Sequence, residues 1–398
     1  MNQASTFPIG AAVTAEALAR GPYPIYRRMR ESEPISWVPA LRMYYVVRYD
    51  LVARILEQPE LFVVGTDQST LFDTFGVHML TVEDPVHSRY KSAFSAAFTP
   101  AALRDGIETQ IRAQAGNLIA GFAAAGETDL RPAFAARLPI LTVLAFFGLS
   151  LEHEADFRLW YDSFERALAN FAWESSVRVA AKENVERLCG LIRDRIEHFR
   201  RVPAPAALIS ALVHAASDKR LDDEEIVRNS LIVMFGGIST VEALILNAVY
   251  ALSSHPETLE RVRRDQALLR AVVDETVRWA GPVQSATRHV ARDTEFEGVS
   301  LRAGDTVNCL LAAANRDPSV FVEPDRFDID RPALRKHLGF AMGAHHCLGA
   351  NLAKLEGRIA LEELLKRLPR CRVADLTAAV PYGNEFRQPQ RLPLVWDR

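Results

Sequence analysis

The sequence feature that most constrains this 398-residue chain is a set of glycine, aromatic and histidine residues grouped around one cysteine. The residues follow the order F-x-x-G-x-H-x-C-x-G and are Phe340, Gly343, His345, Cys347 and Gly349. A helical pattern begins directly after the cysteine, so its thiol meets unpaired backbone N–H groups and the positive end of a helix dipole. Both favour the thiolate, which is the form that binds a metal. Cys-x-Gly alone more simply predicts a buried structural cysteine, whereas the full spacing favours a metal ligand.

The spacing around Cys347 resembles the heme-binding loop of the cytochrome P-450 superfamily, in which one cysteine thiolate holds the iron of heme b. The resemblance implies that Cys347 is the metal ligand and that the loop contacts the cofactor through Phe340, Gly343, His345 and Gly349. The two glycines would let the backbone approach a flat ligand closely. Many members of the superfamily have a further glycine directly after the phenylalanine, where this chain has Ala341.

The composition is that of an ordinary globular protein, with 49% hydrophobic and 24% charged residues. No linker, low-complexity run or internal repeat divides the chain, so we expect one domain over residues 1–398. Within it, the sequence predicts a helix and sheet region over 1–82 and a heme-binding helical region over 83–398. The resemblance implies the cytochrome P-450 fold, a helix-rich triangular single domain that is mainly α with small β-sheets.

The net charge of −3 gives no reason to expect nucleic acid or an anionic membrane surface as a partner. Residues 1–21 lack the basic start and apolar block of a secretory signal, and no apolar run reaches the roughly 18 residues of a membrane span. We therefore expect a soluble, cytoplasmic protein and a monomer. The remaining cysteines have no zinc-like spacing and are expected to be packing residues: Cys189, Cys309 and Cys371.

A long apolar pattern from Asp222 to Ser254 predicts a buried helix that begins with acidic residues. Gly236 and Gly237 lie inside it, although each glycine costs a helix about 1 kcal/mol relative to alanine. The pair therefore needs a reason, and close packing of a neighbouring helix is one. The segment also resembles the superfamily's [A/G]-G-x-[D/E]-T motif, which implies a widened turn over the heme.

In that motif an acid and an alcohol together relay protons, and the resemblance assigns the alcohol to Thr240. Ser239 stands where the acid is usual. A serine can pass a proton along a water chain but cannot supply one from an ionisable group. Glu242 lies three residues further along nearly the same helix face and could support Ser239, although a salt bridge at the surface is its simpler role. The sequence leaves open whether such a relay exists or whether hydrogen peroxide is the oxidant.

His87 and Lys91 lie four residues apart and share a helix face, where two donors could clamp a carboxylate. From the residues alone, a solvated basic face is the simpler explanation. Their segment resembles the superfamily's D-P-P-x-H-x-x-x-R element, which implies contact with a heme propionate, and Arg288 matches the superfamily's propionate-binding arginine. An exposed strand arginine is the alternative for Arg288. By position in the family, the substrate pocket would include Val283, Gln284, Ser285, Phe171 and Phe386.

Glu275 and Arg278 form an E-x-x-R pair, which alone is a common helix feature of small energetic value. In the superfamily this pair forms a buried charge network behind the heme. The segment from Pro324 to Asp328 resembles the superfamily's meander, and the resemblance predicts that Arg326 joins the network.

Taken together, the resemblance implies a heme-thiolate monooxygenase that uses O2 on a small or medium-sized, largely apolar organic substrate. The sequence has no dinucleotide fingerprint or cluster-spaced cysteines, so electrons would come from a separate ferredoxin and ferredoxin reductase. Basic residues near the cysteine helix could steer an acidic ferredoxin, or could simply be solvated: Arg89, Lys354 and Arg358. One alternative is a peroxide-dependent peroxygenase. The other is a non-oxygenating heme isomerase or a heme sensor. Thr240 argues against the sensor.

Overall fold

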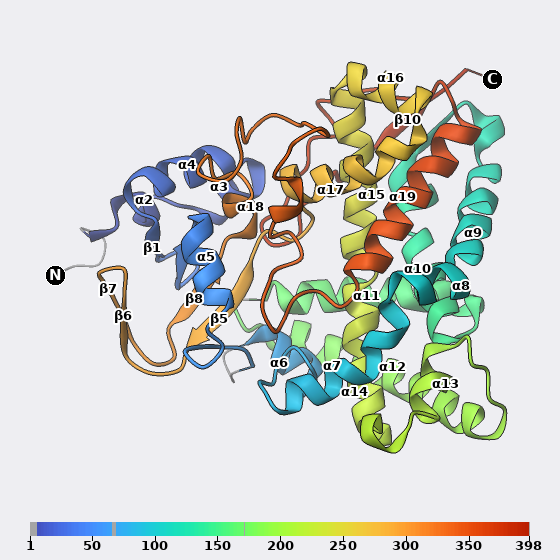
Figure 1. Cartoon of the computed structure of the whole chain (residues 1–398), viewed down its shortest axis with the longest axis horizontal. Helices are drawn as coiled ribbons and strands as arrows, with labels where there is room; N and C mark the ends of the chain where they lie inside the picture. Colours follow the sequence, from blue (N-terminus) through green and yellow to red (C-terminus); the bar gives the residue numbers. More distant parts are fainter. Residues whose placement is uncertain (1–5, 66–68, 171, 398) are drawn as a thin grey trace.

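A mixed five-stranded sheet joins the beginning of the chain to a much later segment. The computed structural model describes residues 6–65, 69–170 and 172–397, and Figure 1 shows this sheet on one side of the molecule and the long helices on the other. In spatial order the strands are β1 (Ile35–Val38), β2 (Met43–Val46), β8 (Thr306–Cys309), β5 (Ala286–Val290) and β3 (Phe62–Val63). β2 runs parallel to β8, and the other neighbours are antiparallel. The predicted 1–82 region therefore shares its sheet with the 83–398 region.

Short helices surround this sheet. They are α2 (Pro8–Ala11), α3 (Ala15–Arg20), α4 (Tyr23–Ser32), α5 (Tyr49–Leu56) and α18 (Leu311–Ala314). The side chains that α5 buries are spaced as one apolar helix face, namely Leu51, Val52, Ile55 and Leu56. α5 contacts both α18 and β8, so it fixes this part of the chain beside the sheet.

Helices, several of them long, make up most of the rest of the molecule. In chain order they are α6 (Thr70–Phe75), α7 (Val86–Ser95), α8 (Pro100–Gly106), α9 (Glu108–Ala120), α10 (Leu138–Phe147), α11 (Glu154–Leu168), α12 (Ser175–Arg201), α13 (Leu208–Val213), α14 (Asp223–Gly236), α15 (Ser239–Ser254), α16 (Pro256–Arg264), α17 (Leu269–Trp279) and α19 (Ala350–Arg367). α19 packs on α9, α15 and α17, which places the helix after the cysteine against the core.

Two smaller sheets complete the fold. β10 (Pro393–Val395) pairs with both β4 (Glu127–Asp129) and β9 (Arg372–Val373), so the last strand of the chain lies beside a strand from the helical middle. β6 (Thr294–Phe296) pairs with β7 (Val299–Leu301). The predicted fold class, mainly α with small β-sheets, is confirmed.

The long apolar segment is two helices rather than one. Asp222 and Glu225 form a capping box at the start of α14. The helix is interrupted at Gly237 and Ile238, where the N–H of Gly237 donates to the carbonyl of Met234, 3.1 Å away, as in a tighter 3₁₀ turn. α14 and α15 are together long and apolar enough to cross a membrane, but 72% of their most apolar window is buried inside the protein, as in a core helix.

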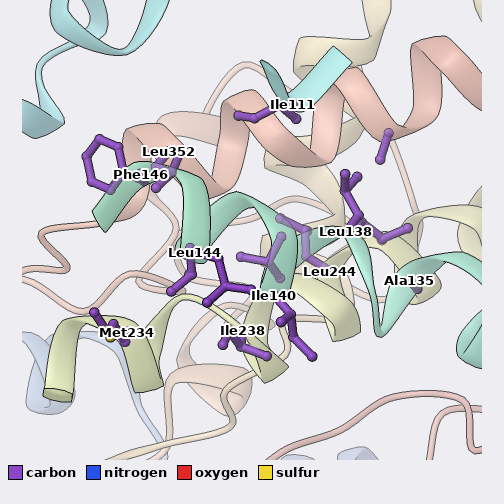
Figure 2. Packing of buried hydrophobic residues seen from close by; sticks show 14 of the residues in the cluster. Ile111, Ala135, Leu138, Ile140, Leu144, Phe146, Met234, Ile238, Leu244 and Leu352 are labelled. Atoms are coloured by element: carbon purple, nitrogen blue, oxygen red, sulfur yellow. The ribbon is translucent and has the colours of Figure 1, made fainter. Parts of the chain in front are cut away.

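The core packs directly against this interruption. Figure 2 shows Ile140 and Leu144 of α10 close to Ile238, with Met234 on the preceding turn. α10 is apolar along nearly its whole length, so it can bury most of its surface between α9 and α15. The break between α14 and α15 is therefore held in place by the hydrophobic core rather than left to bend freely.

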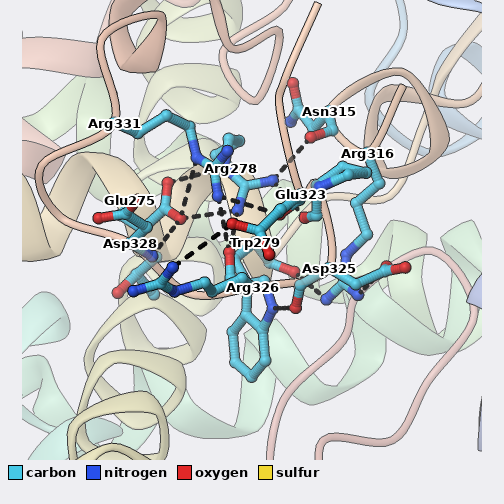
Figure 3. A network of polar contacts seen from close by, with 12 residues as sticks. Glu275, Arg278, Trp279, Asn315, Arg316, Glu323, Asp325, Arg326, Asp328 and Arg331 are labelled. Carbon is cyan, nitrogen blue, oxygen red and sulfur yellow. Dashed lines mark hydrogen bonds and ion pairs between the residues drawn. The ribbon is translucent and has the colours of Figure 1, made fainter. Parts of the chain in front are cut away.

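The E-x-x-R pair forms a fully buried network (Figure 3). Arg278 donates from Nε and Nη2 to the two carboxylate oxygens of Glu275, each at 2.7 Å, and both side chains are 0% exposed. Arg278 also donates to the carbonyl oxygens of Asn315 and Pro324 at 2.9 and 2.8 Å. The Glu275 carboxylate accepts the N–H of Asp328 at 2.7 Å. The network therefore holds the meander to α17.

The role predicted for Arg326 needs correction. Its carbonyl oxygen accepts from Arg278, but its guanidinium is exposed and lies 3.4 Å from Glu323. The second buried guanidinium belongs to Arg331, whose Nε is 3.4 Å from a carboxylate oxygen of Glu275. The segment from Pro324 to Arg331 turns Arg331 inward and Arg326 toward solvent, and the sequence prediction chose the wrong arginine.

Candidate functional site

The cysteine loop is closed by its own backbone. The N–H of Cys347 donates to the carbonyl of Phe340 at 2.9 Å, and α19 begins at Ala350, three residues after the cysteine. The residue is exposed on one side, while the protein packed around its other side raises the pKa of the thiol by desolvation. The N–H groups of Gly349 and Ala350 donate to the sulfur and oppose that rise, as does the charge of Lys91. The pKa of the thiol is raised on balance, and the backbone donors and Lys91 limit the rise.

The two loop glycines have different structural reasons. Gly343 has a φ of +72°, and a Cβ there would lie 2.4 Å from the carbonyl oxygen of Leu56. It is required by its backbone conformation and by contact with α5, which the sequence interpretation, a close approach to a flat ligand, did not foresee. A Cβ on Gly349 would lie 4.0 Å from the sulfur of Cys347, at ordinary contact distance.

Ala341 also has a left-handed backbone, with a φ of +55°. A left-handed conformation costs an L-residue roughly 1–2 kcal/mol, part of which glycine loses again to its greater freedom in the unfolded chain. We expect Ala341→Gly to raise the free energy of unfolding by up to about 1 kcal/mol, measured in urea. Ala344→Gly is the matched control, because Ala344 is not among the positive-φ residues. Ala344→Gly should lower the free energy of unfolding. If both changes alter that free energy equally, the prediction is wrong.

Three donors from separate segments converge near the loop. His87 of α7 and His345 have ring centroids 4.2 Å apart, and the Nδ1 atom of each is buried without a hydrogen-bond partner in the described part of the chain. Arg288 of β5 is 6% exposed, and its burial lowers the pKa of the guanidinium. Glu83 lies 3.0 Å from Nε2 of His345. Buried donors with spare N–H groups are the chemistry that binds carboxylates.

Lys91 ties α7 to the cysteine loop. Its Nζ donates to the carbonyl oxygens of Ala344 and His346 at 2.5 and 2.8 Å. The sequence predicted that it would clamp a carboxylate together with His87, whereas these two bonds are to the loop backbone. Desolvation lowers the pKa of the Lys91 ammonium, while Cys347 and Asp84 raise it.

The hydroxyl of Thr240 donates to the carbonyl oxygen of Gly236 at 2.6 Å, across the break between α14 and α15. A Cβ at Gly236 would meet nothing within 4 Å, so this side of the helix faces open space. At Gly237 a Cβ would lie 3.2 Å from a methyl group of Val143 on α10. Close packing of a neighbouring helix therefore explains Gly237, whereas Gly236 faces open space.

A cavity of about 880 Å³ adjoins the loop and the donors. Its lining includes three of the predicted pocket residues and two of the donors, namely Val283, Ser285, Phe386, Arg288 and His345. Gln284 is a correction, because its side chain is 1% exposed and donates to the carbonyl of Gly281 at 2.6 Å instead of facing the cavity. Phe171 lies outside the described residues.

The sequence interpretation missed one acid of the cavity wall. Glu385 lines the cavity and accepts hydrogen bonds from Ser285 and Asn308. Burial raises the pKa of its carboxyl group, and the two hydrogen bonds oppose that rise. Its place directly before Phe386, which the sequence analysis named as a pocket residue, was the available signal.

Comparison with known proteins identifies the family and the fold. A family model described as Cytochrome P450 matches residues 155–369. The cytochrome P450 monooxygenase PikC of Streptomyces venezuelae is 32% identical over 399 residues, covering 96% of this chain and 92% of that protein. The mycinamicin IV hydroxylase/epoxidase of Micromonospora griseorubida is 31% identical over 385 residues, covering 93% and 94%.

A solved structure of a cytochrome P450 is also similar to this chain. P450BioI, crystallised with an acyl carrier protein ligated to hexadec-9Z-enoic acid, has a TM-score of 0.88 and 28% identity, and the match covers 97% of this chain and 100% of that one. The fold and the cysteine loop together define an oxidoreductase of the heme-thiolate class. The chain belongs to the cytochrome P450 family. The family implies a heme that a cysteine thiolate holds.

Proposed function

We propose that this protein is a monooxygenase that inserts one oxygen atom of dioxygen into a C–H bond of a small or medium-sized, largely apolar organic molecule. The observation that carries the proposal is the Cys347 sulfur, which is exposed on one side and receives N–H groups from Gly349 and Ala350 on the other. A thiolate held in this way is the ligand that lets a heme cleave the O–O bond. The heme, when bound, supplies the redox chemistry.

The residues present fit such a cofactor. Heme b carries two propionate groups, and Nδ1 of His345, which lacks a hydrogen-bond partner in the described residues, and the buried Arg288 offer donors for them. Nδ1 of His87 lies 3.5 Å from the Asp84 carboxylate and would exchange that contact for one with a propionate. Cys347 would hold the iron, and Phe340 would lie in the loop beside it. Lys91, which is bonded to two carbonyl groups of the loop, would keep the cysteine in position. The open side of Gly236 leaves room next to Thr240.

The chain's own contribution to the reaction is to orient the substrate and to move protons. The cavity walls are largely apolar where Val283 and Phe386 lie, and Glu385 with Ser285 adds one polar point for orienting a substrate. The Thr240 hydroxyl donates to Gly236 and so keeps its oxygen lone pairs free to accept a hydrogen bond from the open side of the helix.

Electrons are proposed to come from a separate ferredoxin and its reductase. A hollow beside α19 is lined by Arg104, Arg270, Lys354 and Arg358, together with the acids Glu108 and Asp274. Lys354 pairs with Asp274 at 2.8 Å, and Arg89 pairs with Glu225. Arg358 pairs with both Glu108 and Glu362, so these charges are partly neutralised. The remaining basic excess suits an acidic electron donor behind the cysteine. We also propose that the protein is cytoplasmic and monomeric.

The test is an optical titration of the heme-loaded protein with terpenoids, aromatic acids and fatty acids, followed by turnover with ferredoxin, its reductase and dioxygen. A compound that enters the cavity should shift the Soret band of the ferric heme by displacing water. The same compound should be recovered with one added oxygen atom. A compound that shifts the band and is returned unoxidised under dioxygen, but is oxidised with hydrogen peroxide, would favour a peroxygenase.

Arg288→Ala should speed the loss of heme. The change removes one of several charge-assisted hydrogen bonds to the propionates and should cost roughly 1.5–3 kcal/mol of heme binding. Transfer of heme to apomyoglobin measures the rate. Arg292→Ala, at an exposed position shortly after β5, is the control and should leave the transfer unchanged. Equal transfer rates in both variants would contradict the assignment of Arg288.

A further inference from the structure

Among the described residues that line the cavity, Glu385 is the only acid. Its backbone is held in place, because its carbonyl oxygen accepts the N–H of Gln284 at 2.9 Å and the next residue, Phe386, pairs with Val283 in a β-bridge. Gly383 has a φ of +127°, and a Cβ there would collide with the carbonyl oxygen of Phe386. The turn therefore closes only with glycine at this position, and it fixes the carboxyl group at one part of the cavity wall.

Hydrogen bonds also orient the side chain of Glu385. The hydroxyl of Ser285 donates to one carboxylate oxygen, and Nδ2 of Asn308 donates to the other at 3.2 Å. Oδ1 of Asn308 accepts from the hydroxyl of Thr287 at 3.2 Å, so the amide is held with its N–H groups toward Glu385. A carboxylate accepts about four hydrogen bonds, so these two leave about half of its acceptor sites free. Ser285 and Thr287 line the cavity as well, and this part of its wall is polar.

No cation of the described residues neutralises this carboxylate. The nearest arginine in the sequence, Arg387, donates instead to the carbonyl oxygens of Ala19 and Arg20 at 2.6 and 3.0 Å. Burial raises the pKa of the Glu385 carboxyl group, because an ionised carboxylate without a counter-charge is poorly stabilised away from water. A neutral ligand would supply hydrogen bonds here but no counter-charge, whereas a cationic ligand supplies both.

The cations of the cavity lining have other roles or lie in water. Arg288 and His345 are the donors proposed for the heme propionates. Burial lowers the pKa of His289, which favours the neutral imidazole. Arg42, in the turn between β1 and β2, is exposed, so its charge is solvated and acts only weakly on a ligand. The wall around Glu385 is therefore the negative part of the cavity.

We propose that Glu385 is a specificity-determining residue that selects substrates with a protonated amino group on an otherwise apolar body. The ammonium group donates to the free acceptor sites of the carboxylate. The apolar body lies along the lining that the helices supply, which includes Leu71 of α6, Leu168 of α11 and Phe235 of α14. The proposal rests on the proposed monooxygenase function, since it names the class of molecule that would be oxidised in this cavity.

The test is an optical titration of the ferric, heme-loaded protein with three probes of equal chain length, decylamine, decanol and decanoic acid. The wild type should bind decylamine about 10- to 100-fold more tightly than decanol, which is the value of a hydrogen bond between charged groups, and decanoic acid most weakly. Glu385→Gln should remove this preference and leave decanol binding nearly unchanged. Glutamine can keep both hydrogen bonds, because the Ser285 hydroxyl also accepts.

Glu295→Gln, at an exposed position in β6, removes the same charge from the surface and should keep the preference. The decylamine shift should be that of displaced water, because Glu385 holds the nitrogen. A red shift from nitrogen bound to iron in both the wild type and Glu385→Gln would overturn the proposal.

Two results in the same titration would also show the proposal to be wrong. One is equal weakening of decylamine and decanol in Glu385→Gln, which would mean that the carboxyl group only shapes the cavity. The other is tighter binding of decanoic acid than of decylamine to the wild type. A failure of the monooxygenase function gives a different result, in which decylamine is preferred but none of the three probes gains oxygen with ferredoxin, its reductase and dioxygen.

Discussion

Replacing Cys347 with histidine should abolish the far-red-shifted Soret band of the reduced carbon monoxide complex. That shift requires an anionic sulfur ligand that donates electron density to the iron, and a neutral imidazole does not supply it. The backbone N–H groups of Gly349 and Ala350, which favour the thiolate, would then have no anion to stabilise. The measurement is the optical spectrum of the dithionite-reduced protein under carbon monoxide.

Cys309→Ala is the matched control. Cys309 is fully buried in β8, and burial raises the pKa of its thiol to about 12, so it remains protonated and cannot act as a ligand. The control should keep the shifted band. A shifted band that survives in Cys347→His, or that disappears in Cys309→Ala, would show that another cysteine holds the iron.

Glu275→Gln should lower the free energy of unfolding by about 3–5 kcal/mol, because it leaves the buried Arg278 guanidinium without a counter-charge. Both side chains are 0% exposed, so water cannot compensate for the loss. The N–H of Asp328 would also lose the charged acceptor that holds the meander to α17. Urea unfolding followed by circular dichroism measures the change, and heme content per chain should fall with it.

An exposed pair from the same region provides the comparison. Glu323 lies 3.4 Å from the guanidinium of Arg326, with side-chain exposures of 68% and 64%. Glu323→Gln should change stability by no more than about 1 kcal/mol. If Glu275→Gln has an effect as small as that, burial of the pair contributes little and the meander is held by other contacts.

The elements predicted correctly are those whose cause is local. The start of α19 follows from the pattern directly after Cys347, whereas the apolar period predicted one helix where the structure has α14 and α15. The start of α14 likewise follows from the acidic residues at and after Asp222. Helix propensity and residue spacing act over one or two helical turns. Their effects can therefore be predicted from the sequence alone.

The orientation of Gln284 could also have been predicted. Val283 pairs with Phe386 in an isolated β-bridge, and neighbouring residues of an extended chain point to opposite sides. Val283 and Ser285 therefore face the cavity while Gln284 faces Gly281. Naming all three as pocket residues ignored this alternation.

Other features depend on how distant segments meet. Arg326 and Arg331 lie in one irregular segment with no period, so sequence alone does not indicate which guanidinium turns toward Glu275. The ion pair between Glu242 and Arg131, at 2.7 Å, joins two distant segments, and nothing near either residue in the sequence indicates this partner. The strand β4 has only three residues, and its partner β10 lies at the other end of the chain.

The parallel pairing of Tyr44 in β2 with Val307 in β8 has a consequence for synthesis on the ribosome. The β1–β2 hairpin leaves the exit tunnel early, and an isolated hairpin is at best marginally stable. Its β2 edge stays unpaired until most of the chain has been made, and an unpaired strand edge can join another chain. Met43 and Thr306 from these strands both line the cavity. The wall of the cavity is therefore expected to close late, and nascent chains that stop before β8 should depend on chaperones to remain in solution.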